Sequence, residues 1–141
     1  MIKLDYELNK PTFKYVESLW FDYHDMIIKM RDIELDTHIE EDVNADIKAK
    51  GLTSDPTARQ VFQKDYARQN GKYRTLERYV KTIEQVYNDL TDEHKAIARS
   101  RYFTKQSKSW EKIAQETRYS RVHAIRIRNA IIKETAKKLD L

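Results

Sequence analysis

Residues that break helices are scarce in this chain, and that scarcity constrains the fold more than any other feature. Only two glycines and two prolines occur among 141 residues, and none is a cysteine. Two glycines cannot supply the tight turns of an all-β fold or a glycine-rich phosphate-binding loop. The absence of cysteine excludes disulfides, thiolate nucleophiles, cysteine-type zinc sites and iron–sulfur clusters. The sequence therefore predicts an all-α protein of one compact domain or two small ones.

The spacing of apolar residues predicts two long helices, over residues 12–39 and 72–89. Each segment places an apolar residue at alternating steps of three and four, as in a helix packed against another helix. The first seam consists of Val16, Leu19, Tyr23, Met26, Met30 and Ile33, and the second of Tyr73, Leu76, Val80, Ile83, Val86 or Tyr87, and Leu90. An antiparallel hairpin or bundle is the simplest arrangement, and a dimeric coiled coil would use the same seams.

A short helix is predicted over residues 56–68, because Pro56 follows the two capping candidates Ser54 and Asp55. The stretch before it, residues 40–55, mixes acidic residues with Gly51 and is predicted to be a connector.

The last fifty residues predict three shorter helices. Thr91 precedes the first helix, Ser109 precedes the second, WEKIAQET, and Ser120 starts the third after a tight turn. Serine and threonine oxygens accept hydrogen bonds from the free amides of a first helical turn. Three helices with a sharp turn between the last two form a helix-turn-helix. We therefore expect an acidic helical region for self-association in residues 1–89 and a helix-turn-helix in residues 90–141.

Charge is distributed unevenly along the chain. Residues 1–70 carry 10 basic and 14 acidic side chains, whereas residues 71–141 carry 17 basic and 9 acidic ones. From Thr117 to Lys133 there is no carboxylate at all. A basic helix of this kind is where a polyanion would bind.

The geometry of a helix in a major groove, about 12 Å wide, selects the candidate DNA-binding residues. If Ala124 and Ile127 point inward, the first turns of the third helix present an outward face. Arg121 and Arg126 would then pair with guanine, Asn129 would pair with adenine, and Val122 and Ile125 would contact thymine methyl groups. The remaining candidates lie near the helix start or would contact phosphates: Ser120, Lys105, Lys108, Arg118, His123, Arg128 and Lys133.

Two segments resemble a known family. LTDEHKAIARSRYF and SWEKIAQETRYSRVHAIRIRNAIIKETAKKL resemble region 4 of bacterial sigma factors. With the long N-terminal helix and the segment from Ser54 to Ala58, the whole chain resembles phage late transcription activators of the RinA and ArpU type. The resemblance implies a regulator that activates packaging, structural and lysis genes, with Arg121, Val122, Ile125 and Arg126 as reading residues. Its expected partners are promoter DNA, host RNA polymerase and further copies of the chain.

Other functions compete with this interpretation. A small terminase subunit also joins a helix-turn-helix to oligomerising helices, and a sigma-like protein could bind polymerase without binding DNA. An enzyme is the least expected class, because no catalytic constellation is evident. No metal site or cofactor is expected, since His24 and His38 would lie about 20 Å apart on one helix. The sequence has no long apolar run and no signal-peptide pattern, so we expect a cytoplasmic protein without a membrane segment.

Overall fold

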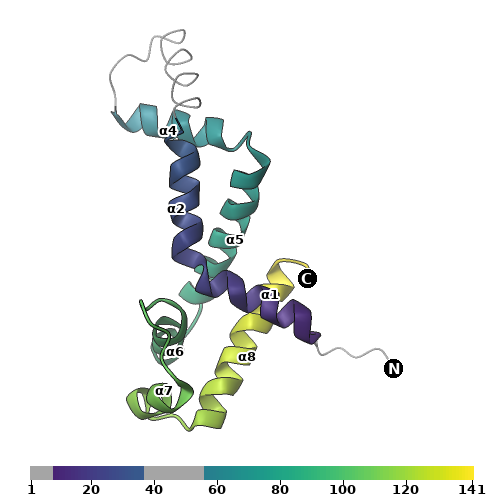
Figure 1. The fold of residues 1–141 in the computed structure, drawn as a ribbon, viewed down its shortest axis with the longest axis vertical. Coiled ribbons are helices and arrows are strands. Elements are labelled where there is room, and N and C mark those ends of the chain that lie inside the picture. The colour runs from purple at the N-terminus through teal and green to yellow at the C-terminus, as the bar shows by residue number, and fades with distance from the viewer. Residues whose placement is uncertain (1–7, 37–55) are drawn as a thin grey trace. The chain divides into compact units, whose positions relative to one another are not determined.

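The computed structural model describes residues 8–36 and 56–141, and in these two ranges the chain forms helices and no strand (Figure 1). The helices are α1 (Lys10–Phe21), α2 (Tyr23–Glu34), α4 (Pro56–Ala67), α5 (Gly71–Asn88), α6 (Asp92–Tyr102), α7 (Trp110–Thr117) and α8 (Arg121–Lys138). This confirms the all-α prediction. None of these helices is long and apolar enough to cross a membrane.

Several helix starts follow from the sequence. The side chains of Asn9 and Thr91 each accept a hydrogen bond from the amide three residues later, at 2.9 and 3.3 Å. The predicted short helix and second long helix are present as α4 and α5, within one residue of the expected bounds. The cap predicted at Ser54 or Asp55 and the connector over 40–55 lie outside the described residues.

The first long helix is not continuous, which corrects the prediction over residues 12–39. The helix stops at Phe21 and restarts at Tyr23, with Asp22 between them at φ −89° and ψ 3°. The amide of Asp22 still donates to the carbonyl of Ser18 at 2.9 Å. The interruption lies close to the place where the chain passes from one compact unit to the other, between residues 24 and 25. Residues 37–39 of the predicted helix lie outside the described residues.

The chain divides into two compact units that do not follow the predicted boundary at residue 90. The helix-turn-helix unit contains α1, the start of α2, the end of α5 and all of α6, α7 and α8. The hairpin unit contains the described part of residues 25–78. The reason is that α1 packs against α8 and so joins the C-terminal helices, as Figure 1 shows.

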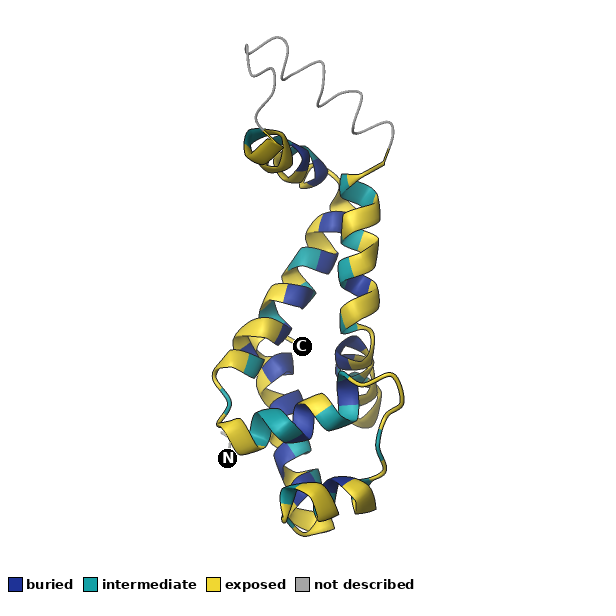
Figure 2. Cartoon of the chain, turned by 90° about the vertical axis from the view of Figure 1, so that its left-hand side faces the viewer, coloured by how far each residue is buried: buried dark blue, intermediate teal, exposed yellow. Residues whose placement is uncertain are grey.

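In the helix-turn-helix unit the core is built from one face of each helix, and Figure 2 shows buried and exposed positions sharing each helix. Trp20 of α1 is fully buried and its indole Nε1 donates to Thr135 Oγ1 of α8 at 3.0 Å. Because Thr135 is also fully buried, this bond satisfies two groups that burial would otherwise leave unpaired. The second predicted seam is confirmed as buried, by Val80, Ile83 and Val86 in this unit and by Tyr73 and Leu76 in the hairpin unit.

In the hairpin unit, α2 and the start of α5 run in opposite directions (Figure 1). The hydroxyl of Tyr73, near the start of α5, donates to Glu34 Oε1, the last residue of α2, at 2.8 Å. Arg68, after α4, bridges Asp65 at 2.9 Å and Glu77 of α5 at 3.2 Å. These contacts support the antiparallel hairpin that the two seams predict.

Candidate nucleic-acid interface

The start of α8 is held by a short turn after α7. Ser109 and Ser120 cap the two helices, accepting from amides three residues later at 3.2 and 3.1 Å as predicted. Between the helices Arg118 adopts the left-handed conformation, with φ 63°. That conformation ends a helix abruptly and is commonly taken by glycine. It lets α8 begin only three residues after Arg118.

The inward face of α8 is the one predicted. Ala124 is fully buried, and Ile127 and Ile131 are 7% and 3% exposed. This places Arg121, Val122 and Arg126 on the solvent side, where all are exposed, and leaves Ile125 half-buried. Val122 is 58% exposed, so its methyl groups are accessible on this face.

Arg128 does not lie on this free surface, which corrects its predicted role as a phosphate contact. Its Nη1 lies 2.7 Å from Glu17 Oε2 of α1, and its side chain is only 16% exposed. Its Nε also donates to Asn129 Oδ1 at 2.7 Å. The amide oxygen of Asn129 is therefore engaged inside the protein, and Asn129 itself is half-buried.

Glu17 is the centre of a polar cluster beneath α8. The same Oε2 atom that binds Arg128 accepts a hydrogen bond from the Tyr102 hydroxyl of α6 at 2.7 Å. Burial, together with this bond, raises the pKa of Tyr102 far above its usual range. Glu17 thus ties α1 to both α6 and α8. Sequence reasoning missed it because its partners lie 85 and 111 residues away.

Aromatic rings surround the two arginines of this region. The guanidinium of Arg128 lies 5.2 Å from the ring of Phe13 and 5.1 Å from that of Trp110. Arg101 lies on Trp110 at 4.7 Å and on Phe21 at 5.9 Å. Cations within about 6 Å of a ring face are attracted by its quadrupole. Both arginines therefore serve packing between α1 and the C-terminal helices.

Two more predicted basic residues are paired with carboxylates of α7. Arg121 Nε lies 3.0 Å from Glu111 Oε1, and both side chains are more than half exposed. Lys108 Nζ lies 2.8 Å from Glu116 Oε2. The stretch without carboxylates is thus partly neutralised by the helix before it. Exposed pairs of this kind are worth about 0–1 kcal/mol, so a phosphate can compete for the cation.

The other predicted residues remain accessible at the turn before α8, along α8 and in the loop after α6. Lys105, Arg118, Ser120, His123 and Lys133 are all exposed. The rings of His123 and Tyr119 contact each other, with centroids 4.9 Å apart. The exposed Arg118, Arg121 and Arg126 belong to one short stretch of chain at the turn and the first turns of α8.

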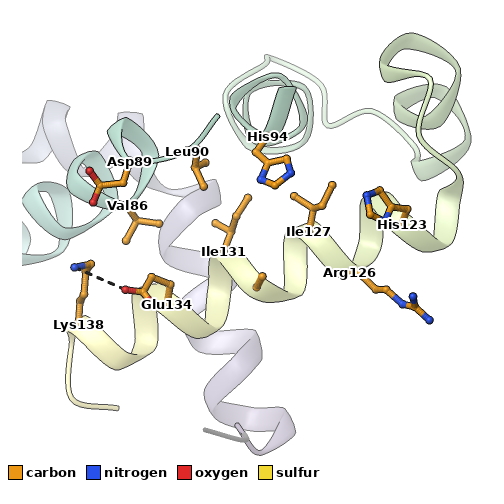
Figure 3. Close-up of a pocket in the computed structure, with 11 residues that line it drawn as sticks. Val86, Asp89, Leu90, His94, His123, Arg126, Ile127, Ile131, Glu134 and Lys138 are labelled. Carbon is orange, nitrogen blue, oxygen red and sulfur yellow. Dashed lines mark ion pairs between the residues drawn. The ribbon is translucent and has the colours of Figure 1, made fainter. Parts of the chain in front are cut away.

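An apolar groove of about 470 Å³ lies along the flank of α8 (Figure 3). Val86 and Leu90 face Ile127 and Ile131 across it, and His94 lies between α6 and α8. Arg126 lines the groove but its guanidinium points outward into solvent. Glu134 and Lys138 form an ion pair of 3.8 Å at the other end. The outward-pointing Arg126 side chain is free to approach a ligand on the exposed face.

Among the described residues, no group of three histidine or acidic side chains is arranged to hold a metal ion. His38, considered in the sequence together with His24, lies outside the described residues.

Comparison with known proteins gives one family. No curated protein and no solved structure matches this chain. A family model matches residues 15–137, which covers nearly all of the described helices. The chain belongs to the family described as a protein of unknown function (DUF722).

Proposed function

We propose that this protein is a sequence-specific, double-stranded DNA-binding regulator of transcription that reads DNA with α8. The observation that carries the proposal is the exposed face of the first turns of α8, which combines Arg121, Val122 and Arg126 beside the tight turn at Arg118. Arginine suits guanine edges and phosphates, and an apolar side chain suits a thymine methyl group.

We assign the candidate residues to roles by the exposure of their side chains. Arg121, Val122 and Arg126 are the proposed base-reading residues, with Ile125 behind them. Phosphate contact is assigned to the exposed residues Lys105, Arg118, Ser120, His123 and Lys133. Arg128 is not among the proposed phosphate contacts, because its guanidinium is paired with Glu17.

The resemblance to late transcription activators suggests what such binding would control. We propose that the regulated genes are phage or prophage late genes for packaging, structure and lysis. Activation needs no chemistry in this chain, since a few kcal/mol of added contact can hold polymerase at a weak promoter.

Selection of genome fragments by the purified protein at two salt concentrations tests the proposal. We expect enrichment of a specific upstream site, with affinity that falls as salt rises because bound cations release counterions from DNA. Arg126→Ala should weaken specific binding by about 1–3 kcal/mol, as expected for one lost bidentate base contact. Arg74→Ala, which removes an exposed arginine of α5 outside this unit, is the matched control. Equal binding to every fragment by all three proteins would contradict the proposal.

A second candidate is a protein that binds RNA polymerase without binding DNA. The apolar groove beside α8 favours it, because apolar surface lined by Val86, Leu90, Ile127 and Ile131 suits a protein segment. Retention of polymerase on the immobilised protein, combined with the absence of salt-sensitive DNA binding, would favour this candidate. A ring of many subunits in a mass measurement would instead favour a small terminase subunit.

A further inference from the structure

A second cavity of the helix-turn-helix unit lies away from the exposed face of α8. It has a volume of about 440 Å³, within the range of about 300–1,000 Å³ typical of small-ligand sites. The start of α2, the end of α5 and the end of α6 supply its walls. It shares no lining residue with the groove in Figure 3.

Aromatic side chains form much of the wall. The ring of Phe103 lies 5.1 Å from that of Tyr23 and 5.7 Å from that of Tyr87, measured between centroids. His24 lies 5.6 Å from the same phenylalanine. Ile83, which is fully buried, adds an aliphatic surface. The planes of these rings are inclined to that of Phe103 by 44–66°, so a planar ring that stacks on one of them meets the others edge-on.

The polar groups of the cavity differ in character. Glu84 accepts a hydrogen bond from the Tyr23 hydroxyl at 2.7 Å through Oε2. Arg99 donates through Nη1 to the Tyr87 hydroxyl at 2.9 Å, which leaves its other N–H groups for a ligand. Lys95 is not part of the lining, but its Nζ lies 5.7 Å from the centroid of the Tyr87 ring and places a second cation beside this tyrosine. Asn88 supplies an amide with both donors and an acceptor.

Together these groups define a ligand class. An aromatic wall suits a planar heterocycle, a carboxylate and an amide suit the donors and acceptors on its edge, and two cations beside one tyrosine suit an anionic group. A nucleotide carries all three features: a base, its polar edge and a phosphate. We propose that this cavity binds a nucleotide, with the base on Phe103 and Tyr87 and the phosphate at Arg99. The site is independent of the DNA-binding face of α8.

Calorimetric titration of the full chain with AMP, GMP, CMP and UMP tests the proposal. We expect saturable binding of at least one of them. Arg99→Gln should weaken it about tenfold, the effect of losing one charge-assisted hydrogen bond. The corresponding nucleoside, which lacks the phosphate, should bind equally to the wild type and to Arg99→Gln. Glu84→Gln should weaken the base contact in both. If a short single-stranded oligonucleotide binds with higher affinity than the free nucleotide, single-stranded nucleic acid is the source of the nucleotide that the cavity binds.

Arg74→Gln is the matched control, since it removes an exposed arginine of the hairpin unit and should leave nucleotide binding unchanged. Arg126→Gln is measured beside it for duplex binding. Thermal melting followed by circular dichroism checks that Glu84→Gln and Arg99→Gln remain folded. Absence of saturable binding for all four monophosphates overturns the proposal, and so does binding that neither cavity variant changes. Duplex binding by the same proteins keeps the two proposals apart. If only Arg126→Gln loses duplex affinity, the duplex binds at α8. If only Arg99→Gln loses nucleotide affinity, the nucleotide binds in the cavity.

Discussion

Among single residues, Glu17 stabilises the packing of three helices, which its place on an amphipathic helix does not indicate. Its Oε2 atom binds both Arg128 and the Tyr102 hydroxyl at 2.7 Å. Glu17→Ala would leave a guanidinium and a hydroxyl without this partner in a region that is largely shielded from water. Because both charged side chains retain 16–18% exposure, we expect a loss of about 2 kcal/mol, below the 3–5 kcal/mol of fully buried pairs.

Urea unfolding followed by tryptophan fluorescence measures this loss. Both tryptophans of the chain, Trp20 and Trp110, belong to the helix-turn-helix unit, so the signal reports on that unit. Glu111→Ala is the control, because its ion pair with Arg121 is exposed and should change stability by less than about 1 kcal/mol. Equal midpoints for the two variants would show that the Glu17 cluster does not stabilise the unit.

Tyrosine ionisation gives a second prediction at this scale. The hydrogen bond with Tyr79, at 2.8 Å between the hydroxyls, and burial raise the pKa of Tyr15 to about 12. Burial and hydrogen bonds to Glu84 and Glu34 raise the pKa values of Tyr23 and Tyr73 further. An unfolded tyrosine ionises near pH 10, so between about pH 10 and 12 the folded chain holds more protons than the unfolded one. The contribution of these tyrosines to the free energy of unfolding is therefore fully present below about pH 10, and it decreases as the pH rises through this window.

Ultraviolet absorbance of tyrosinate tests this sign. We expect part of the tyrosine absorbance to develop above pH 10 in the native protein and near pH 10 in urea. Tyr15→Phe should remove one of the late-titrating groups. A native titration that overlays the one in urea would contradict the prediction.

At the scale of elements, the turn before α8 stores strain that a glycine would relieve. Arg118 is a non-glycine residue at φ 63°, a conformation that costs roughly 1–2 kcal/mol for residues with a Cβ. Arg118→Gly would remove this cost, but the greater freedom of glycine in the unfolded chain offsets part of the effect. We therefore expect a net stabilisation of about 0.5–1 kcal/mol. Arg118→Ala removes the same charge without relieving the backbone.

Comparison of these two variants by thermal unfolding and DNA binding separates the cap from the charge. Both should weaken duplex binding equally if Arg118 contacts phosphate, while only Arg118→Gly should melt at higher temperature. A lower melting temperature for Arg118→Gly than for Arg118→Ala would contradict the strain argument.

The helices themselves follow closely from local sequence. Capping residues such as Ser109 and Ser120, and the seams of α5 and α8, fix their starts and their inward faces, because these signals depend on near neighbours. The break at Asp22 left no such signal, since the apolar spacing from Leu19 to Tyr23 continues across it. The ion pairs of Arg128 and Arg121 could not be predicted either. Their partners, Glu17 and Glu111, are distant in sequence or on another helix, and a helical pattern shows which face is buried but not what covers it.

In the molecule as a whole, α1 completes the core of the helix-turn-helix unit. Trp20 is fully buried against Thr135, and the aromatic rings of α1 contact Arg101 and Arg128. A fragment of residues 90–141 would expose the face of α8 that α1 covers. Losing a buried tryptophan alone costs about 3–5 kcal/mol, a large part of the stability of a small domain.

We therefore expect the isolated fragment 90–141 to show little cooperative unfolding and weak DNA binding, although it contains every proposed base-reading residue. Circular dichroism melting and duplex titration of this fragment beside the full chain measure both effects. Trp20→Ala in the full chain should reproduce much of the loss, whereas Ile28→Ala, an exposed apolar residue of the hairpin unit, should leave DNA binding unchanged. A fragment that melts cooperatively and binds duplex like the full chain would show that α1 is dispensable. In that case residues 90–141 would form an independent domain, and the contacts of α1 would add little to its stability.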